Sequence, residues 1–95
     1  MATIFSGQIT VTTAGTAVQG ASVAPYDGVR SGFYIRALSA NTGLIYIGND
    51  GADDVTSANG YELAAGNAVF IPCKNLNELW FDSSVNGEKA CWLKG

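Results

Sequence analysis

Apolar and polar residues alternate along much of this chain with a period of two, which is the pattern of β-strands buried on one face. Residues 8–12 (Gln-Ile-Thr-Val-Thr) show this alternation directly. In residues 33–38, Arg36 falls on the face opposite to Phe33 and Ile35, so a strand is predicted there as well. Further strands are predicted at 17–19, near Val23, and at 44–48, 61–63, 68–71, 78–82 and 89–93. Because no window of about 11 residues carries apolar side chains at helical spacing, no long helix is expected.

Turn-forming residues interrupt this pattern roughly every 8–12 residues. Asn59-Gly60 suits the positive φ angles of a tight turn. Two further turns, at residues 41–43 and at Asn86-Gly87, are expected to close hairpins. These hairpins would join residues 33–38 to 44–48, and residues 78–82 to 89–93.

About seven or eight short strands with such turn signals predict an all-β fold. We expect a single small domain over residues 1–95, built as an antiparallel β-sandwich or a jelly-roll-like barrel. Residues 1–7 either form a flexible N-terminal arm or lead directly into the first strand. Both interpretations remain open from the sequence.

The composition shows that this small domain has few charged residues with which to cover its surface. Charged residues make up 14% of the 95 residues, against about 25% in ordinary globular proteins. Hydrophobic residues make up 47% of the chain, and the net charge is −3. This balance hints that part of the surface is buried against other chains.

The same composition excludes several classes of function. The chain has no histidine, which excludes Ser-His-Asp and Cys-His catalysis and ordinary His-ligated metal sites. Five basic residues against eight acidic ones argue against nucleic-acid binding. Apolar runs are far shorter than the roughly 20 residues that span a bilayer, and the N-terminus lacks the features of a signal peptide. No cofactor or small-molecule ligand is expected.

Two cysteines, Cys73 and Cys91, are too few for a disulfide-stapled scaffold. Free, partly buried thiols are the favoured interpretation, and a single disulfide is the alternative. A metal site made from two cysteines and no histidine is the least favoured.

Two groups of carboxylates are candidate sites. Residues 49–54 carry three aspartates and an asparagine that could supply oxygens to calcium, but the spacing does not match an EF-hand, so a solvated loop is favoured. Glu62 could pair with Glu78 or Asp82 as in a glycosidase, yet no spacing marks these acids as partners. We therefore expect no enzymatic activity.

Aromatic residues are the better candidates for function. Trp80 and Phe81 are adjacent, so they point to opposite faces of their strand and one of them leaves the core; the same holds for Phe70 and Ile71. An apolar outer face on a charge-poor domain favours contact with another protein. An aromatic platform that stacks on sugars is the alternative, built from Trp80 and Trp92 with Tyr26, Tyr34, Tyr46 and Tyr61. The predicted interface residues are Phe5, Phe70, Trp80, Phe81 and Trp92.

The whole chain also resembles a group of small bacteriophage virion proteins. The resemblance runs over roughly residues 8 to 93 and is carried by strands and turns, at residues 9–19, 35–37, 41–48, 55–57, 59–63, 66, 75–80 and 92–93. The residues 20–32 and the two cysteines depart from the usual pattern, which leaves the second strand and its pairing in doubt.

Proteins that look like this are capsid decoration (cement) proteins or domains of head fibres. The resemblance implies a small β-sandwich or jelly roll that assembles as a homotrimer. It also implies that this trimer binds the major capsid protein on the outer surface of the virion, after synthesis in the bacterial cytoplasm. It implies no active site, so no functional residue is carried over. The alternative function is a carbohydrate- or host-surface-binding module of a phage fibre.

Overall fold

A computed structural model describes residues 5–22, 32–49, 55–56 and 59–94, with the backbone alone for Phe5 and Lys94. Eight strands and one short 3-10 helix form in these segments. In chain order they are β1 (Phe5–Val11), β2 (Val18–Gln19), β3 (Phe33–Ala37), β4 (Ile45–Gly48), β5 (Tyr61–Leu63), β6 (Ala68–Ile71), η1 (Leu76–Glu78), β7 (Trp80–Ser83) and β8 (Glu88–Lys94). Within the described segments no helix is long and apolar enough to cross a membrane.

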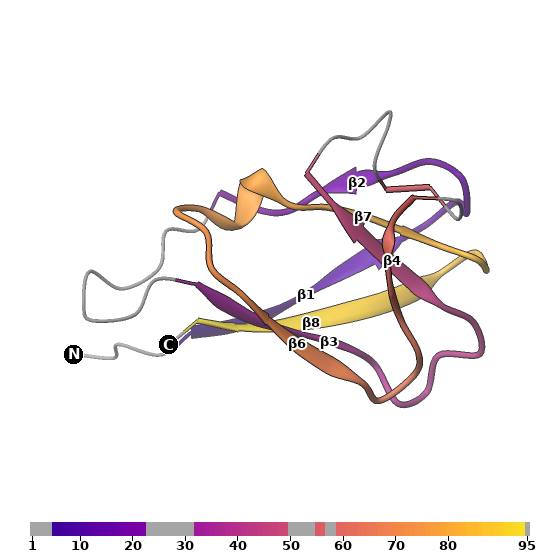
Figure 1. Ribbon diagram of the computed structural model, residues 1–95. Coiled ribbons are helices and arrows are strands. Elements are labelled where there is room, and N and C mark those ends of the chain that lie inside the picture. The colour runs from indigo at the N-terminus through magenta and orange to yellow at the C-terminus, as the bar shows by residue number, and fades with distance from the viewer. Residues whose placement is uncertain (1–4, 23–31, 50–54, 57–58, 95) are drawn as a thin grey trace.

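The strands form two antiparallel four-stranded sheets, which lie one above the other in Figure 1. Sheet A has the order β1-β8-β3-β6, and sheet B has the order β2-β7-β4-β5. The first strand pairs with the last, the second with the seventh, the third with the sixth and the fourth with the fifth. The chain is thus one long hairpin that is rolled up, so that β8 also meets β3 and β7 also meets β4. This is the topology of a jelly roll, and the predicted antiparallel sandwich is confirmed.

The two predicted hairpins are wrong, although their four strands were predicted to within two residues of the observed bounds; Glu78, predicted as strand, belongs to η1. β3 belongs to sheet A and β4 to sheet B, so residues 38–44 cross from one sheet to the other. Residues 84–87 make the same kind of crossing between β7 and β8. A turn signal marks where the chain reverses direction, but it does not say whether the next strand joins the same sheet.

The core lies between the two sheets and follows the alternation in the sequence. In β3 the inward residues are buried and the outward ones exposed, as predicted for Arg36. Leu76 of η1 closes part of the core, and Trp92 packs edge-on against Phe33 with ring centroids 5.8 Å apart. The buried apolar cluster comprises Ile9, Val11, Phe33, Ile35, Ala37, Ile45, Ile47, Leu63, Leu76, Leu79, Phe81 and Ala90.

Glycine is required at Gly7 and Gly60 by close packing. A Cβ on Gly7 would lie 2.6 Å from Cζ2 of Trp92, so the indole ring can pass over β1 only because this position has no side chain. A Cβ on Gly60 would lie 2.8 Å from Cβ of Tyr46. The positive φ predicted at Asn59-Gly60 is wrong, since neither residue adopts one. Gly87 does adopt a positive φ, of 79°.

Of the segment 1–7, residues 5–7 are part of β1 and pair with β8, so they do not form an arm. Residues 1–4 and the strand predicted near Val23 lie outside the described residues.

Candidate interaction surface

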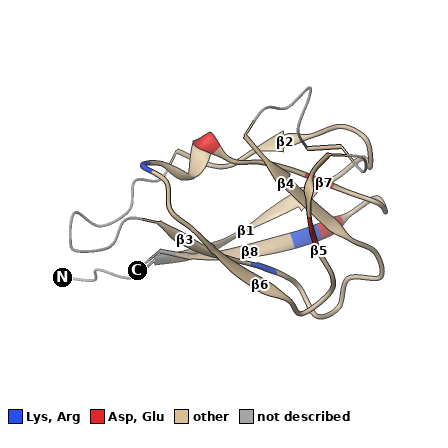
Figure 2. Ribbon diagram, viewed as in Figure 1, with Lys and Arg blue, Asp and Glu red and all other residues tan. Residues whose placement is uncertain are grey.

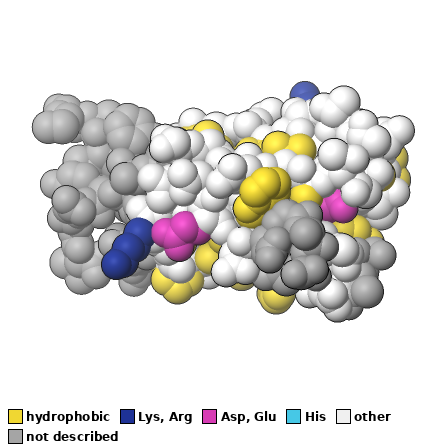
Figure 3. Space-filling model, turned by 90° about the horizontal axis from the view of Figure 1, so that it is seen from above, with side chains coloured by type: hydrophobic (Ala, Val, Ile, Leu, Met, Phe, Trp, Pro, Cys, Tyr) yellow, Lys and Arg dark blue, Asp and Glu magenta, His cyan; other side chains and the backbone are white. Residues whose placement is uncertain are grey.

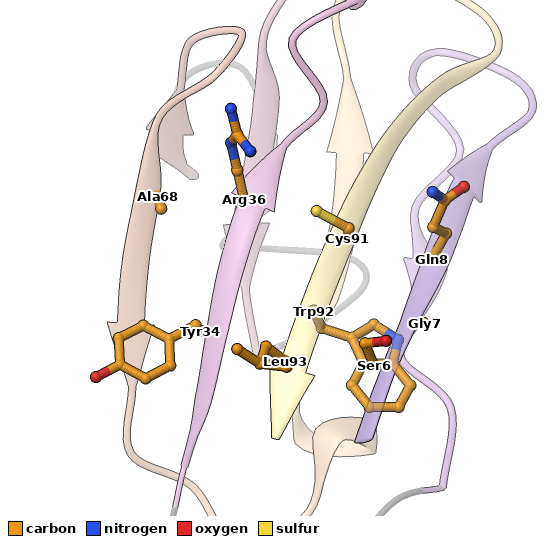
Figure 4. Close-up of a pocket in the computed structure, with 9 residues that line it drawn as sticks. All are labelled: Ser6, Gly7, Gln8, Tyr34, Arg36, Ala68, Cys91, Trp92 and Leu93. Atoms are coloured by element: carbon orange, nitrogen blue, oxygen red, sulfur yellow. The ribbon is translucent and has the colours of Figure 1, made fainter. Parts of the chain in front are cut away.

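The outer face of sheet A is hollowed into an open concavity of about 700 Å³ (Figure 4). All four strands of the sheet contribute to it. We call this surface the concave face; it is lined by Ser6, Gly7, Gln8, Tyr34, Arg36, Ala68, Cys91, Trp92 and Leu93. No element of the described chain covers it in Figure 1, where sheet A forms the lower layer.

The strand register places the outward side chains in two neighbouring rows. In the first row Tyr34 of β3 lies between Phe70 of β6 and Leu93 of β8, and Leu93 is opposite Ser6 of β1. This row is mainly apolar, and it leaves Tyr34 42% and Leu93 41% exposed. The ring centroids of Tyr34 and Phe70 are 4.8 Å apart, and the two ring planes are tilted by 59° to one another. The concave face therefore has one apolar end.

The second row carries the polar end of the concave face. Arg36 lies between Ala68 and Cys91, and Cys91 is opposite Gln8. Figure 4 shows the Arg36 and Gln8 side chains on either side of Cys91, with Tyr34 and Leu93 at the other end of the concavity.

Positive charge on this face has no acidic partner within the described segments. Arg36 donates from Nε to the carbonyl of Gly66 at 3.3 Å, which fixes the direction in which the guanidinium points. Lys89 precedes Cys91 by one outward position on β8, and its backbone is held by the side chain of Asn41 through hydrogen bonds of 2.7 and 3.2 Å. Figure 2 shows that charged residues are sparse over the described part of the fold. Arg36 thus presents a planar cation, suited to a carboxylate, beside apolar side chains.

The outer face of sheet B differs, because loops of the same chain cover it. Tyr46 and Asp82 point outward there, yet each is only 6% exposed. Oδ1 of Asp82 accepts hydrogen bonds from the backbone N–H of Gly15 at 2.9 Å and of Ser83 at 2.8 Å. Asn86 holds the same loop through the N–H of Ala14 at 2.8 Å. Figure 3 looks down on this side of the molecule, where the hydrophobic side chains of the described residues appear as separate yellow patches between white backbone and other side chains.

The carboxylates considered as a glycosidase pair are not brought together as one. Glu62 and Asp82 lie in one row of sheet B but with Tyr46 between them, and Asp82 is engaged by backbone N–H groups. Glu78 belongs to η1, where its Oε2 accepts from the N–H of Lys74 at 3.1 Å. A fourth acid, Glu88, is buried and accepts from the N–H groups of Thr42 and Gly43.

The predicted interface residues are distributed over different parts of the fold. Either Phe70 or Ile71 was expected to point away from the core. Phe70 is the one that does so, on the outer side of sheet A, while Ile71 packs against the core. Phe81 is fully buried in the core, so it is not available for contact with another chain, and Trp80 is the member of that pair that points outward, from sheet B. Trp92 is partly buried and packs against the core, and it also borders the concave face beside Gly7. The side chain of Phe5 lies outside the described residues.

Sequence reasoning missed Tyr34, Leu93 and Arg36 as members of one surface. The available signal was their position in the alternating pattern, since Tyr34 and Leu93 occupy outward positions where a polar residue is expected. The sugar platform is not formed from the tryptophans, because Trp80 faces outward from sheet B and Trp92 inward from sheet A. Tyr26 lies outside the described residues.

Both cysteines have free thiols. Cys73 packs against the core, whereas Cys91 lines the concave face. Burial raises the pKa of the Cys73 thiol, as does the nearby carboxylate of Glu78, while a hydrogen bond from the backbone of Asn75 acts in the opposite direction. Among the described residues no three His, Cys, Asp or Glu side chains gather into a possible metal site, and the predicted acidic loop at 50–54 lies outside them.

A scan against models of protein families finds no match, and searches of curated proteins and of solved structures find none either.

Proposed function

We propose that this chain is a structural virion protein, a capsid decoration protein that binds the outer surface of a phage capsid as a homotrimer. The observation that carries the proposal is the concave face, an exposed and partly apolar sheet surface on a domain with few charges. Surfaces of this kind mark contacts with other proteins. The jelly-roll topology and the resemblance of residues 8–93 to small virion proteins agree with this function.

The physical work of such a protein is to add contacts that exist only in the assembled capsid. A ligand that binds the assembled state alone stabilises it by an amount that grows with concentration and affinity. A trimer that touches several capsid subunits at once gains further through its effective local concentration. We propose that the concave face is buried between subunits of the homotrimer, and that the trimer binds at the joints between major capsid protein subunits.

Carbohydrate binding is the alternative, and the geometry supports it less. A sugar ring stacks best on aromatic faces that lie nearly coplanar, whereas Tyr34 and Phe70 are tilted by 59° to one another. A hit on a glycan array, together with no binding to capsids, would favour this alternative.

The test is co-sedimentation of the purified protein with capsids built from the major capsid protein of the same virion. Leu93→Glu places a charge on the concave face, and Val85→Glu is its matched control, because Val85 is 40% exposed in the turn between β7 and β8. We expect the wild-type chain and Val85→Glu to bind the capsids and to raise their melting temperature. Leu93→Glu should bind at least about tenfold more weakly. A wild-type chain that does not sediment with these capsids would overturn the proposal.

A further inference from the structure

We propose that the concave face receives the β5 edge of a second copy of this chain, with the carboxylate of Glu62 from one copy pairing with the guanidinium of Arg36 in the next. This inference rests on the homotrimer of the proposed function and names the two surfaces that would meet in it. It is argued from charge, from the partners of each acid and from the shape of the two surfaces.

Charge disfavours contact between two concave faces. Arg36 and Lys89 are both outward on sheet A, and the described part of that face has no carboxylate to offset them. Two such faces placed together would oppose like charges away from water, which is unfavourable. A different surface that brings an acid therefore suits the concave face better than a second concave face does.

Glu62 is the described acid that is free to take this role. Asp82 and Glu88 are buried and accept backbone N–H groups, and Glu78 accepts the N–H of Lys74. Glu62 is exposed, and none of the side-chain hydrogen bonds or ion pairs found within the described segments involves its carboxylate. Its carboxylate can form the paired hydrogen bonds that a guanidinium favours.

The shape of β5 suits the concave face. β5 is a three-residue edge strand of sheet B, paired on one side with β4. Next to Glu62, Tyr61 is 57% exposed, which makes it the most exposed large hydrophobic side chain in the described part of the chain. Adjacent strand residues point to opposite faces, so an edge-on approach lets both side chains contribute. An aromatic ring and an acid then meet a surface with an apolar end and an arginine end.

The contact joins two different surfaces, so it is heterologous. A head-to-tail contact of this kind extends from copy to copy and closes into a ring when the rotation permits. A ring of three copies is the homotrimer of the proposed function, with one concave face covered in each subunit.

The test is a charge exchange, followed by light scattering behind size exclusion over a range of protein concentrations. Arg36→Glu and Glu62→Arg should each weaken assembly at least about tenfold, because each places like charges opposite one another. The double variant restores opposite charges and should assemble within about threefold of the wild-type chain. Lys74→Glu is the matched control for Arg36→Glu, since it makes the same change in net charge at an exposed position outside both surfaces, and it should assemble normally.

Two further measurements test the contact without reversing a charge, so that they do not depend on whether the charge-reversal variants fold. Arg36→Gln and Glu62→Gln remove the charges without reversing them and should weaken assembly by less than the reversals. Alkylation of Cys91 by iodoacetamide should slow when the wild-type chain assembles, because Cys91 lies beside Arg36 in the concave face.

A wild-type chain with single-chain mass at every concentration would overturn the inference. So would charge reversals that leave assembly unchanged, or a double variant that assembles no better than the single ones. Failure of the proposed function looks different: the chain would assemble through Arg36 and Glu62 but would not bind capsids. If the trimer binds capsids and the reversals leave its mass unchanged, the inference fails while the proposed function stands.

Discussion

The two outer faces of this sandwich differ in how far their outward side chains are exposed to solvent. On sheet B, Tyr46 and Asp82 point outward, yet loops of the chain leave each of them only 6% exposed. On sheet A, Tyr34 and Leu93 also point outward, and they remain 42% and 41% exposed. The chain itself covers the middle of the outer face of sheet B, around Tyr46 and Asp82, whereas no described segment covers Tyr34 and Leu93 on sheet A.

The difference arises from where the connections pass. Sheet B consists of strands of two to four residues, and the loop before β2 folds back over it, where Asp82 and Asn86 hold the backbone of Ala14 and Gly15. Sheet A contains two strands of seven residues, β1 and β8, which extend as an uncovered surface. An uncovered apolar surface on a small domain is therefore informative about function, while a covered one reports on folding.

The largest expected effect compares one tyrosine from each face. Tyr46→Ala should lower the free energy of unfolding by about 2–4 kcal/mol, because it empties a site that the chain has enclosed. Tyr34→Ala should cost less than about 1 kcal/mol, since its site is open to water. Urea denaturation at concentrations where the chain is monomeric measures both. Equal costs at the two positions would contradict the contrast between the faces.

A smaller effect concerns the loop that covers sheet B. Asp82→Ala removes the acceptor for the N–H of Gly15 and should cost about 1–3 kcal/mol. Amide exchange at Gly15 should also become faster. Glu62→Ala is the control on the same sheet, and it should change the stability of the monomer by less than about 0.5 kcal/mol because Glu62 is exposed. If Gly15 exchanged at the wild-type rate in Asp82→Ala, the hydrogen bond would not be what holds the loop.

The smallest effect is a pH dependence at Cys73, the thiol that packs against the core. Burial and the Glu78 carboxylate raise its pKa above the ordinary 9.0. Below pH 9 the thiol is protonated in both the folded and the unfolded chain, so stability does not depend on it. As pH rises above about 9, the unfolded chain releases the proton first, and the contribution of Cys73 to stability decreases.

This dependence can be measured by following alkylation of native Cys73 against pH in a Cys91→Ser background, with the urea-unfolded chain as reference. The native thiol should titrate at a higher pH than the unfolded one. Replacing Cys73 with serine should flatten the loss of stability above pH 9. A native thiol that titrates at or below pH 9.0 would show that burial does not govern it.

Much of the local structure followed from the sequence, because alternation is a property of neighbouring residues. The position of Arg36 opposite Phe33 and Ile35 was correct, and so were the approximate bounds of the described strands. The sequence does not determine which residue of two adjacent aromatic residues points into the core. Trp80 and Phe81 satisfy the alternation equally well with either one inside, and only the packing of sheet B on sheet A buried Phe81 completely.

The sequence by itself determined that this chain forms short strands with two distinct faces, separated by turns. Tertiary structure alone decided which strands pair, because β1 meets β8 and β3 meets β6 across long stretches of chain that no local pattern records. It also decided that Tyr46 is covered while Tyr34 is exposed. Alternation distinguishes the two faces of a strand, but whether an outward face meets a loop or solvent depends on the path of distant segments.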